Sequence, residues 1–315
     1  MERNFNNLSE LQLALIKIVV FFDMFSYPLT AYELWRYLGV SAEFKEVFAE
    51  AQGLITLGFL AGEQGFYFLP GQNQLVATRK QRYHYTNRKL KIARRAVRLF
   101  RLLPTVQFAA LSNLIGRHNL RDGSDIDIFI IAKENRIWIT RLFCAGVMKL
   151  LRQRPTPSRK RDKICLSFYI DSAHLDLSPL ADGPEDYYFH FWLAGLYPLY
   201  DAGAYHHQLM AANSWLKQYL PNGDFVVNNN SYRESPRYWL SRRLVLSFWS
   251  HICNRLEVLA RSFQLLIMPA ALKEKINLDS RVIIGEGVLK LYLVDRRQEF
   301  MRRYQERLRR LFHAS

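Results

Sequence analysis

The sequence predicts an α+β protein in which a small β-sheet is flanked by helices, and three observations support this class. Short apolar runs typical of buried strands occur at 106–111, 126–131 and 164–170. A helical segment, 137–151, separates the second run from the third. Long segments with helical periodicity precede and follow these runs. We therefore expect a sheet core with helical parts before and after it in the sequence.

The composition is that of a folded, strongly basic chain. Of its 315 residues, 50% are hydrophobic and 14% are aromatic, which excludes a disordered protein. Lys and Arg number 44 against 28 Asp and Glu, which gives a formal net charge of +16. This excess favours polyanionic partners such as nucleic acid, nucleoside triphosphates or an anionic membrane surface, and composition alone does not choose among them.

The cysteines and the apolar segments predict a cytoplasmic protein. Cys144, Cys165 and Cys253 are far apart in the sequence and form no Cys-x-x-Cys pair, so we expect reduced thiols. The first seven residues lack the features of a signal peptide. The most apolar stretch, 11–22, contains a lysine and is too short to cross a bilayer. We therefore expect no membrane-spanning segment.

Residues 1–76 are expected to form an N-terminal domain with the element order of a winged helix. Ser9 and Thr30 each open a capping box, which predicts two helix starts, and a third helix is expected after Ser41. A hairpin follows at 59–69, around a turn bounded by glycines. In a DNA-binding winged helix the third helix contacts DNA. Here that helix is mostly acidic, so we favour protein packing or dimerisation for this domain.

Residues 77–103 are predicted to form a basic linker helix. Leu90, Ala93, Val97 and Phe100 give it an apolar stripe at helical spacing. Its cations have no acidic residue among them: Arg79, Lys80, Arg82, Arg88, Lys89, Lys91, Arg94, Arg95, Arg98 and Arg101. Two interpretations remain open, which are a solvated helix that joins two domains and a surface that binds RNA or DNA.

Two carboxylates mark the start of the second predicted strand. Asp125 and Asp127 are two residues apart, so their side chains point to the same face, while Ile126 and Ile128 point to the other. Carboxylates roughly 6–7 Å apart repel each other unless a cation lies between them. Oxygen ligands of this kind suit Mg²⁺. We therefore predict a metal site at Asp125 and Asp127.

This region resembles the nucleotidyltransferase fold of the polymerase β type. The superfamily pattern is a hydrophobic strand, Gly-Ser, a spacer, and then two aspartates separated by one apolar residue. Here 106–111 is the strand, and Asp125 and Asp127 stand at the matching distance from it. More narrowly, the chain is similar to uncharacterised bacterial and archaeal nucleotidyltransferase-domain proteins with an N-terminal winged helix. The further matches are Arg136–Arg141, Cys165–Tyr169 and Tyr219–Asn222.

The resemblance implies a small mixed sheet within 104–183 and magnesium-dependent nucleotidyl transfer. Asp125 and Asp127 would hold Mg²⁺, and a second metal ion or Asp171 would assist deprotonation of the acceptor. The phosphate oxygens of a nucleoside triphosphate would be contacted by Ser112, Asn113 and Ser124. A nucleoside monophosphate would pass to a hydroxyl acceptor that the sequence does not identify, and pyrophosphate would leave.

Two departures from the family pattern support a second hypothesis. Asn113 and Leu114 replace the Gly-Ser pair, which hinders close backbone approach and removes a hydroxyl. Ser167 lies in the third strand where an acid is expected, which makes Asp171 the nearest substitute. The alternative is a catalytically impaired protein that binds nucleotide or nucleic acid through its basic helices. A transcription regulator acting through the winged helix is a third hypothesis.

Residues 184–315 are predicted to form a helical C-terminal domain. Helices are expected at 186–199, 204–220 and 239–271, with a terminal basic helix at 289–312. The histidines of this region have no metal-ligand spacing, so we expect them to serve packing or surface roles. The oligomeric state is left open by the sequence.

Overall fold

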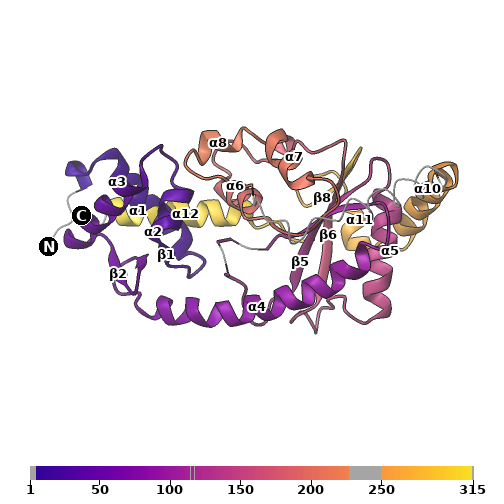
Figure 1. Cartoon of the computed structure of the whole chain (residues 1–315), viewed down its shortest axis with the longest axis horizontal. Coiled ribbons are helices and arrows are strands. Elements are labelled where there is room, and N and C mark those ends of the chain that lie inside the picture. The colour runs from indigo at the N-terminus through magenta and orange to yellow at the C-terminus, as the bar shows by residue number, and fades with distance from the viewer. Residues whose placement is uncertain (1–4, 114, 117, 227–249, 314–315) are drawn as a thin grey trace.

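The protein is an α+β structure with a small sheet near one end and a larger sheet beyond it (Figure 1). The computed structural model describes residues 5–113, 115–116, 118–226 and 250–313. The predicted class is therefore confirmed. Within these ranges, no helix combines the length and the apolar character that crossing a membrane requires.

The N-terminal unit packs three helices against the small antiparallel sheet. Ser9 and Thr30 cap α1 (Glu10–Asp23) and α2 (Ala31–Tyr37), and both predicted capping boxes are present. The next helix, α3, spans Phe44–Thr56. The sheet order is β1-β3-β2, and these strands span Leu29–Thr30 (β1), Ala61–Glu63 (β2) and Phe66–Phe68 (β3).

The predicted linker helix is α4 (Gln74–Phe100), which runs along one side of the molecule from the N-terminal unit to the large sheet (Figure 1). Its basic residues differ in their burial, and Arg88 is half-buried. Arg79, Arg82 and Lys89 are buried and bind other elements. The exposed cations are Lys80, Lys91, Arg94, Arg95 and Arg98. The three buried cations therefore bind α4 to neighbouring elements and are not presented to solvent.

The large sheet has the strand order β7-β4-β5-β6-β9-β8. β5 and β6 are parallel and connected through α5 (Ile137–Leu150), while the other neighbours are antiparallel, so the sheet is mixed. The predicted strands are β4, β5 and β6, at Val106–Leu111, Ile126–Ala132 and Ile164–Asp171. The added strands are β7, β8 and β9, at Tyr197–Asp201, Val282–Gly285 and Val288–Leu291.

The structure corrects the helices expected at 186–199 and 289–312. α6 (Tyr187–Ala194) ends at Gly195, and the following residues form β7 on the edge of β4. The second segment is β9, a connecting turn, and then α12 (Arg297–His313). A free sheet edge exposes unpaired backbone groups, and β7 and β9 pair with the two edges of the predicted strands. Residues after 184 therefore complete the sheet that the sequence confined to 104–183.

Other helices of the C-terminal region are shorter than expected. Residues 239–249 of the helix predicted at 239–271 lie outside the described ranges, and the rest is divided before Pro269. The bounds are Tyr205–Ala212 (α7), Leu216–Tyr219 (α8), Ser250–Leu266 (α10) and Ala270–Lys273 (α11).

The two faces of the large sheet are covered by different apolar layers. On one face, Phe129 and Phe168 contact Trp192 of α6, in a core that continues into α1 of the N-terminal unit. On the other face, Ile128 and Ile130 pack in the cluster that contains residues of α4 and α5. α12 lies beside α1 (Figure 1). The first face is therefore shared by elements from both ends of the chain.

Candidate active site

Asp125 and Asp127 lie where the sequence predicted, at the start of β5. Phe129, which shares their strand face, belongs to the core around α6, whereas Ile126 and Ile128 belong to the opposite core. The predicted orientation of the two carboxylates is therefore confirmed. In the parallel pairing of β5 with β6, Asp127 lies beside Cys165.

These residues form a group that could hold a metal ion. One ligand atom from each of Asp125, Asp127 and Cys165 lies within 4.8 Å of the others. A divalent cation there would meet two carboxylate oxygens, as predicted, and a sulfur atom that was not predicted. A third carboxylate, the expected partner, is not part of this group in the described chain.

The two carboxylates are electrostatically poised to receive a cation. Burial, together with the negative charge of Asp125, raises the pKa of Asp127 to about 7. Burial also raises the pKa of Asp125, although its own backbone amide, Lys160 and Lys89 act in the opposite direction. Two buried carboxylates with raised pKa values retain a proton between them when no cation is bound. A metal ion would replace that proton.

Cys165 comes to the site through an irregularity in the strand pairing. Asp127 pairs with Cys165, but Phe129 pairs with Phe168, so β6 has one more residue in this interval than β5. The Cys165 Sγ lies 2.8 Å from the Ser167 Oγ. Burial and the charge of Asp127 raise the thiol pKa well above its usual value. The predicted acid position, Ser167, is therefore adjacent to the group but does not supply the ligand.

Asp171 is not brought to the metal group. It pairs with Ala132 at the far end of β6, roughly 16 Å along the strand from the Asp127 position at 3.3 Å per residue. Its carboxylate accepts hydrogen bonds from the amides of Asn135 and Ala173 and lies 2.7 Å from the His174 Nδ1. These contacts organise the turns that follow β5 and β6, so the structure gives Asp171 a local structural role.

The predicted phosphate-binding residues bind the backbone of the strand that carries the carboxylates. The Ser112 amide donates to the Asp127 carbonyl oxygen at 2.9 Å, and Asn113 Nδ2 donates to that of Asp125 at 3.0 Å. Ser124 Oγ donates to the carbonyl oxygens of Arg121 and Asp125. Asn113 Oδ1 is buried without a hydrogen-bond partner in the described structure. Leu114, which completes the altered Gly-Ser pair, lies outside it.

Lys89 of α4 holds the turn that leads into the site. Its side chain is fully buried, and its Nζ donates to the carbonyl oxygens of Asp122 and Ser124 and to the Asp162 carboxylate. Arg88 binds the carboxylates of Asp122 and Asp162. Two cations of the predicted basic helix therefore bind the turn that precedes Asp125.

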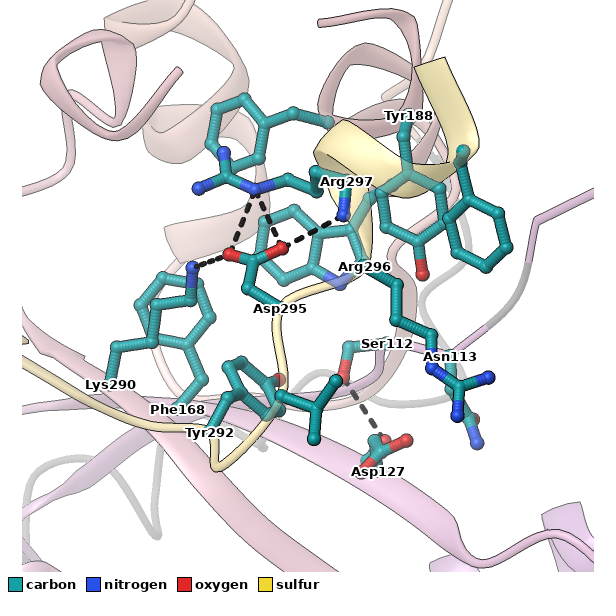
Figure 2. A pocket seen from close by; sticks show the side chains of 14 residues that line it. Ser112, Asn113, Asp127, Phe168, Tyr188, Lys290, Tyr292, Asp295, Arg296 and Arg297 are labelled. Atoms are coloured by element: carbon teal, nitrogen blue, oxygen red, sulfur yellow. Dashed lines mark hydrogen bonds and ion pairs between the residues drawn. The ribbon is translucent and has the colours of Figure 1, made fainter. Parts of the chain in front are cut away.

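A cavity of 270 Å³ opens beside Asp127 (Figure 2). Ser112, Asn113 and Asp127 line one side of it. The opposite side consists of residues from α6, from β9, from α12 and from the segment between β9 and α12, none of which the sequence assigned to a site. They include Tyr188, Trp192, Lys290, Tyr292, Asp295, Arg296, Arg297 and Phe300.

The charges around the cavity differ in how fully they are neutralised. Asp295 accepts hydrogen bonds from Lys290 Nζ at 2.9 Å and from Arg297 Nε at 3.0 Å, and Arg297 also binds Asp186 at 2.8 Å. Although burial opposes the effect, Lys290 and Arg297 lower the pKa of Asp295. Arg296, at the start of α12, is exposed and makes no side-chain hydrogen bond or ion pair with the described residues. It is therefore a cation available to a ligand.

Aromatic rings form the remaining wall. The rings of Tyr188 and Phe300 stack with centroids 5.2 Å apart, and Tyr292 lines another part of the cavity. Burial, with the charge of Asp127, raises the pKa of Tyr188 to about 12, so its hydroxyl keeps its proton at neutral pH. The same two causes raise the pKa of Tyr292. The cavity thus combines a carboxylate, a free guanidinium and neutral phenols.

Comparisons with protein-family models, with curated proteins and with solved structures find no match to this chain.

Proposed function

We propose that the protein is a metal-dependent nucleotidyltransferase that moves a nucleoside monophosphate from a nucleoside triphosphate to a hydroxyl acceptor. The observation that carries the proposal is the group formed by Asp125, Asp127 and Cys165, with Asp127 facing a cavity that also receives Arg296. The mixed sheet, the position of the carboxylates on β5 and the N-terminal helix–hairpin order agree with the nucleotidyltransferase and winged-helix architecture inferred from sequence.

The residues divide the proposed chemistry between two sides of the cavity. Asp125 and Asp127 would hold a divalent ion, Mg²⁺ in our proposal, which would neutralise charge on the triphosphate during in-line attack. Arg296 is placed to bind phosphate oxygens from the opposite side, because its side chain extends from the start of α12 into the cavity lining (Figure 2). The rings of Tyr188, Phe300 and Tyr292 offer flat apolar surfaces for a base.

The experiment is Mg²⁺- or Mn²⁺-dependent turnover of the four nucleoside triphosphates, measured by pyrophosphate release and by labelling of the protein or added RNA. We expect Asp127→Asn to lower the rate roughly a hundred-fold or more. Glu274→Gln is the matched control because it removes one carboxylate at an exposed position far from β5 in the sequence. Equal rates in wild type and Asp127→Asn would contradict the proposal.

A second candidate function is binding of nucleotide or nucleic acid without transfer. The observation that favours it is the thiol of Cys165 at the place where a third carboxylate would be expected. The exposed cations of α4 and of the loop at 152–163 would then bind the phosphate backbone of RNA or DNA. Nucleotide binding that needs no metal and persists in Asp127→Asn, with no pyrophosphate released, would favour this function.

A further inference from the structure

A second cavity, of 280 Å³, lies between the N-terminal unit and α4. It is lined from α2 by Glu33 and Arg36, from α4 by Arg79 and Tyr83, and from the segment after β4 by His118. Neither Asp125 nor Asp127 lines it, so it is separate from the candidate active site. The Tyr83 and His118 rings contact each other in its wall, with centroids 4.8 Å apart and planes tilted by 44°.

One arginine of this cavity is fully neutralised. Arg79 is 2% exposed, and its Nη1 and Nη2 each donate to a different oxygen of Glu33 at 2.8 Å. Glu33 also accepts a hydrogen bond from the Tyr27 hydroxyl at 2.5 Å. The charge of Glu33 is therefore neutralised by Arg79. For this reason Glu33 does not repel an anion in the cavity as a free carboxylate would.

The other arginine is buried without an anion. Arg36 is 7% exposed, its Nη1 donates to the Tyr32 hydroxyl at 3.3 Å, and its Nε is buried with no partner. Its guanidinium lies 4.7 Å from the centre of the Phe225 ring, and no described carboxylate forms an ion pair with it. A guanidinium has five N–H donors, and burying it unpaired is costly. Such a group in a cavity wall points to a missing acceptor.

We propose that this cavity binds a phosphate-type oxyanion on Arg36. The planar guanidinium can donate two parallel hydrogen bonds to such a group, and the hydroxyls of Tyr32 and Tyr83 are available beside it. The anion is either free phosphate or the phosphoryl group of a small phosphomonoester. This site needs no metal ion and no nucleotidyl transfer, so it stands or fails independently of the proposed function.

The test is binding of inorganic phosphate and of AMP to the full chain without divalent metal, by calorimetry and by the shift of the thermal unfolding midpoint. Chloride at equal ionic strength is the reference. We expect saturable binding by wild type and at least roughly ten-fold weaker binding by Arg36→Met, because a charge-assisted hydrogen-bond pair is lost. Tighter binding of AMP than of phosphate would identify a phosphomonoester site, and equal binding a free-anion site.

Arg95→Gln is the matched control, because it removes one exposed cation of α4 and should leave phosphate binding unchanged. If Arg36→Met does not fold, Arg36→Lys is the second variant, since it keeps the charge and loses the two-pronged geometry, and it should bind phosphate several-fold more weakly. Absence of saturable binding by wild type would overturn the proposal. So would equal affinities in wild type and a folded Arg36 variant.

Discussion

At the scale of single residues, the candidate site is set by the partners of each charged group. Burial and the charge of Asp125 raise the pKa of Asp127. A bound cation would therefore displace the proton of this residue. Arg297 is occupied by Asp186 and Asp295, whereas the neighbouring Arg296 has no such partner in the described chain. Adjacent residues of the same type therefore have different roles, one in structure and one in the proposed binding of phosphate.

Cation binding should depend on pH through Asp127. With a pKa of about 7, its ionised fraction rises about ten-fold between pH 6 and pH 8, so the dissociation constant for Mn²⁺ should fall roughly ten-fold over this interval. Calorimetric titration at several pH values measures this change. Asp127→Asn should bind weakly at all of them, and a pH-independent dissociation constant in wild type would contradict the assignment.

The stability of the metal-free protein should change with pH for the same reason. The pKa of Asp127 is higher in the folded chain than its ordinary value of 3.8, so the folded state holds this proton more tightly. This contribution is complete at pH below 3.8 and is lost as the pH rises to about 7. The contribution of Asp127 to the free energy of unfolding, measured with urea, should therefore fall over this pH range. The same contribution should be absent in Asp127→Asn.

Cys165 should influence which metal ion the site prefers. A sulfur ligand favours softer ions such as Mn²⁺ or Zn²⁺ over Mg²⁺ when compared with a carboxylate. We expect Cys165→Asp to raise the ratio of Mg²⁺- to Mn²⁺-supported activity roughly ten-fold, and Cys165→Ser to produce no comparable increase. Metal titrations of the three proteins measure the ratio. An unchanged ratio in Cys165→Asp would exclude Cys165 from the metal site.

At the scale of elements, the sequence predicted what depends on local signals. The capping boxes at Ser9 and Thr30 and the apolar runs of β4, β5 and β6 specify their structures without help from distant residues. The segment of β7 was predicted to be helical because its short aromatic run has no strand signal of its own. It forms a strand because it pairs with β4 at the edge of the sheet.

The same limit applies to the site. Asp125 and Asp127 were predictable from their alternation on one strand, but Cys165 reaches them through parallel pairing and a local bulge, which the sequence does not display. Arg296 reaches the cavity because α12 starts there, far along the chain. Asp171 was chosen by its nearness in sequence to the missing acid, and the direction of β6 carries it away.

Helix α4 offers a test of an element's structural role. Lys89 is fully buried and binds two carbonyl oxygens and the Asp162 carboxylate, so Lys89→Met should lower the free energy of unfolding by roughly 3 kcal/mol. Lys91→Met, on the exposed side of the same helix, should change it by less than about 0.5 kcal/mol. Urea unfolding compares them, and similar losses in both variants would contradict the role assigned to Lys89.

At the scale of the whole molecule, helices from early and late in the chain pack together. The Tyr304 hydroxyl of α12 donates to the Lys17 carbonyl oxygen of α1 at 3.2 Å, and α12 lies beside α1 (Figure 1). β7 and β9 flank the predicted central strands. The cavity beside Asp127 is likewise walled by residues on both sides of 184.

A fragment comprising residues 1–183 should therefore fail to fold as a stable unit. It would lack β7 and β9, leaving both edges of the β4–β5–β6 sheet unpaired, and it would lack the Trp192 side of the core. Limited proteolysis and circular dichroism against the full chain would show this. A protease-resistant fragment with a cooperative unfolding transition would indicate that the sheet does not need its C-terminal strands.

The strand order also sets a sequence of events during synthesis. β5 and β6 leave the ribosome as neighbours, but β9, which pairs with β6, emerges more than a hundred residues later, after β7 has closed the other edge. A nascent chain folds the parts whose partners are already present, and distant pairings form late. The N-terminal helices can assemble early, whereas the central sheet keeps one open edge until β9 has been synthesised. During that interval, β6 is the strand most exposed to pairing with another chain.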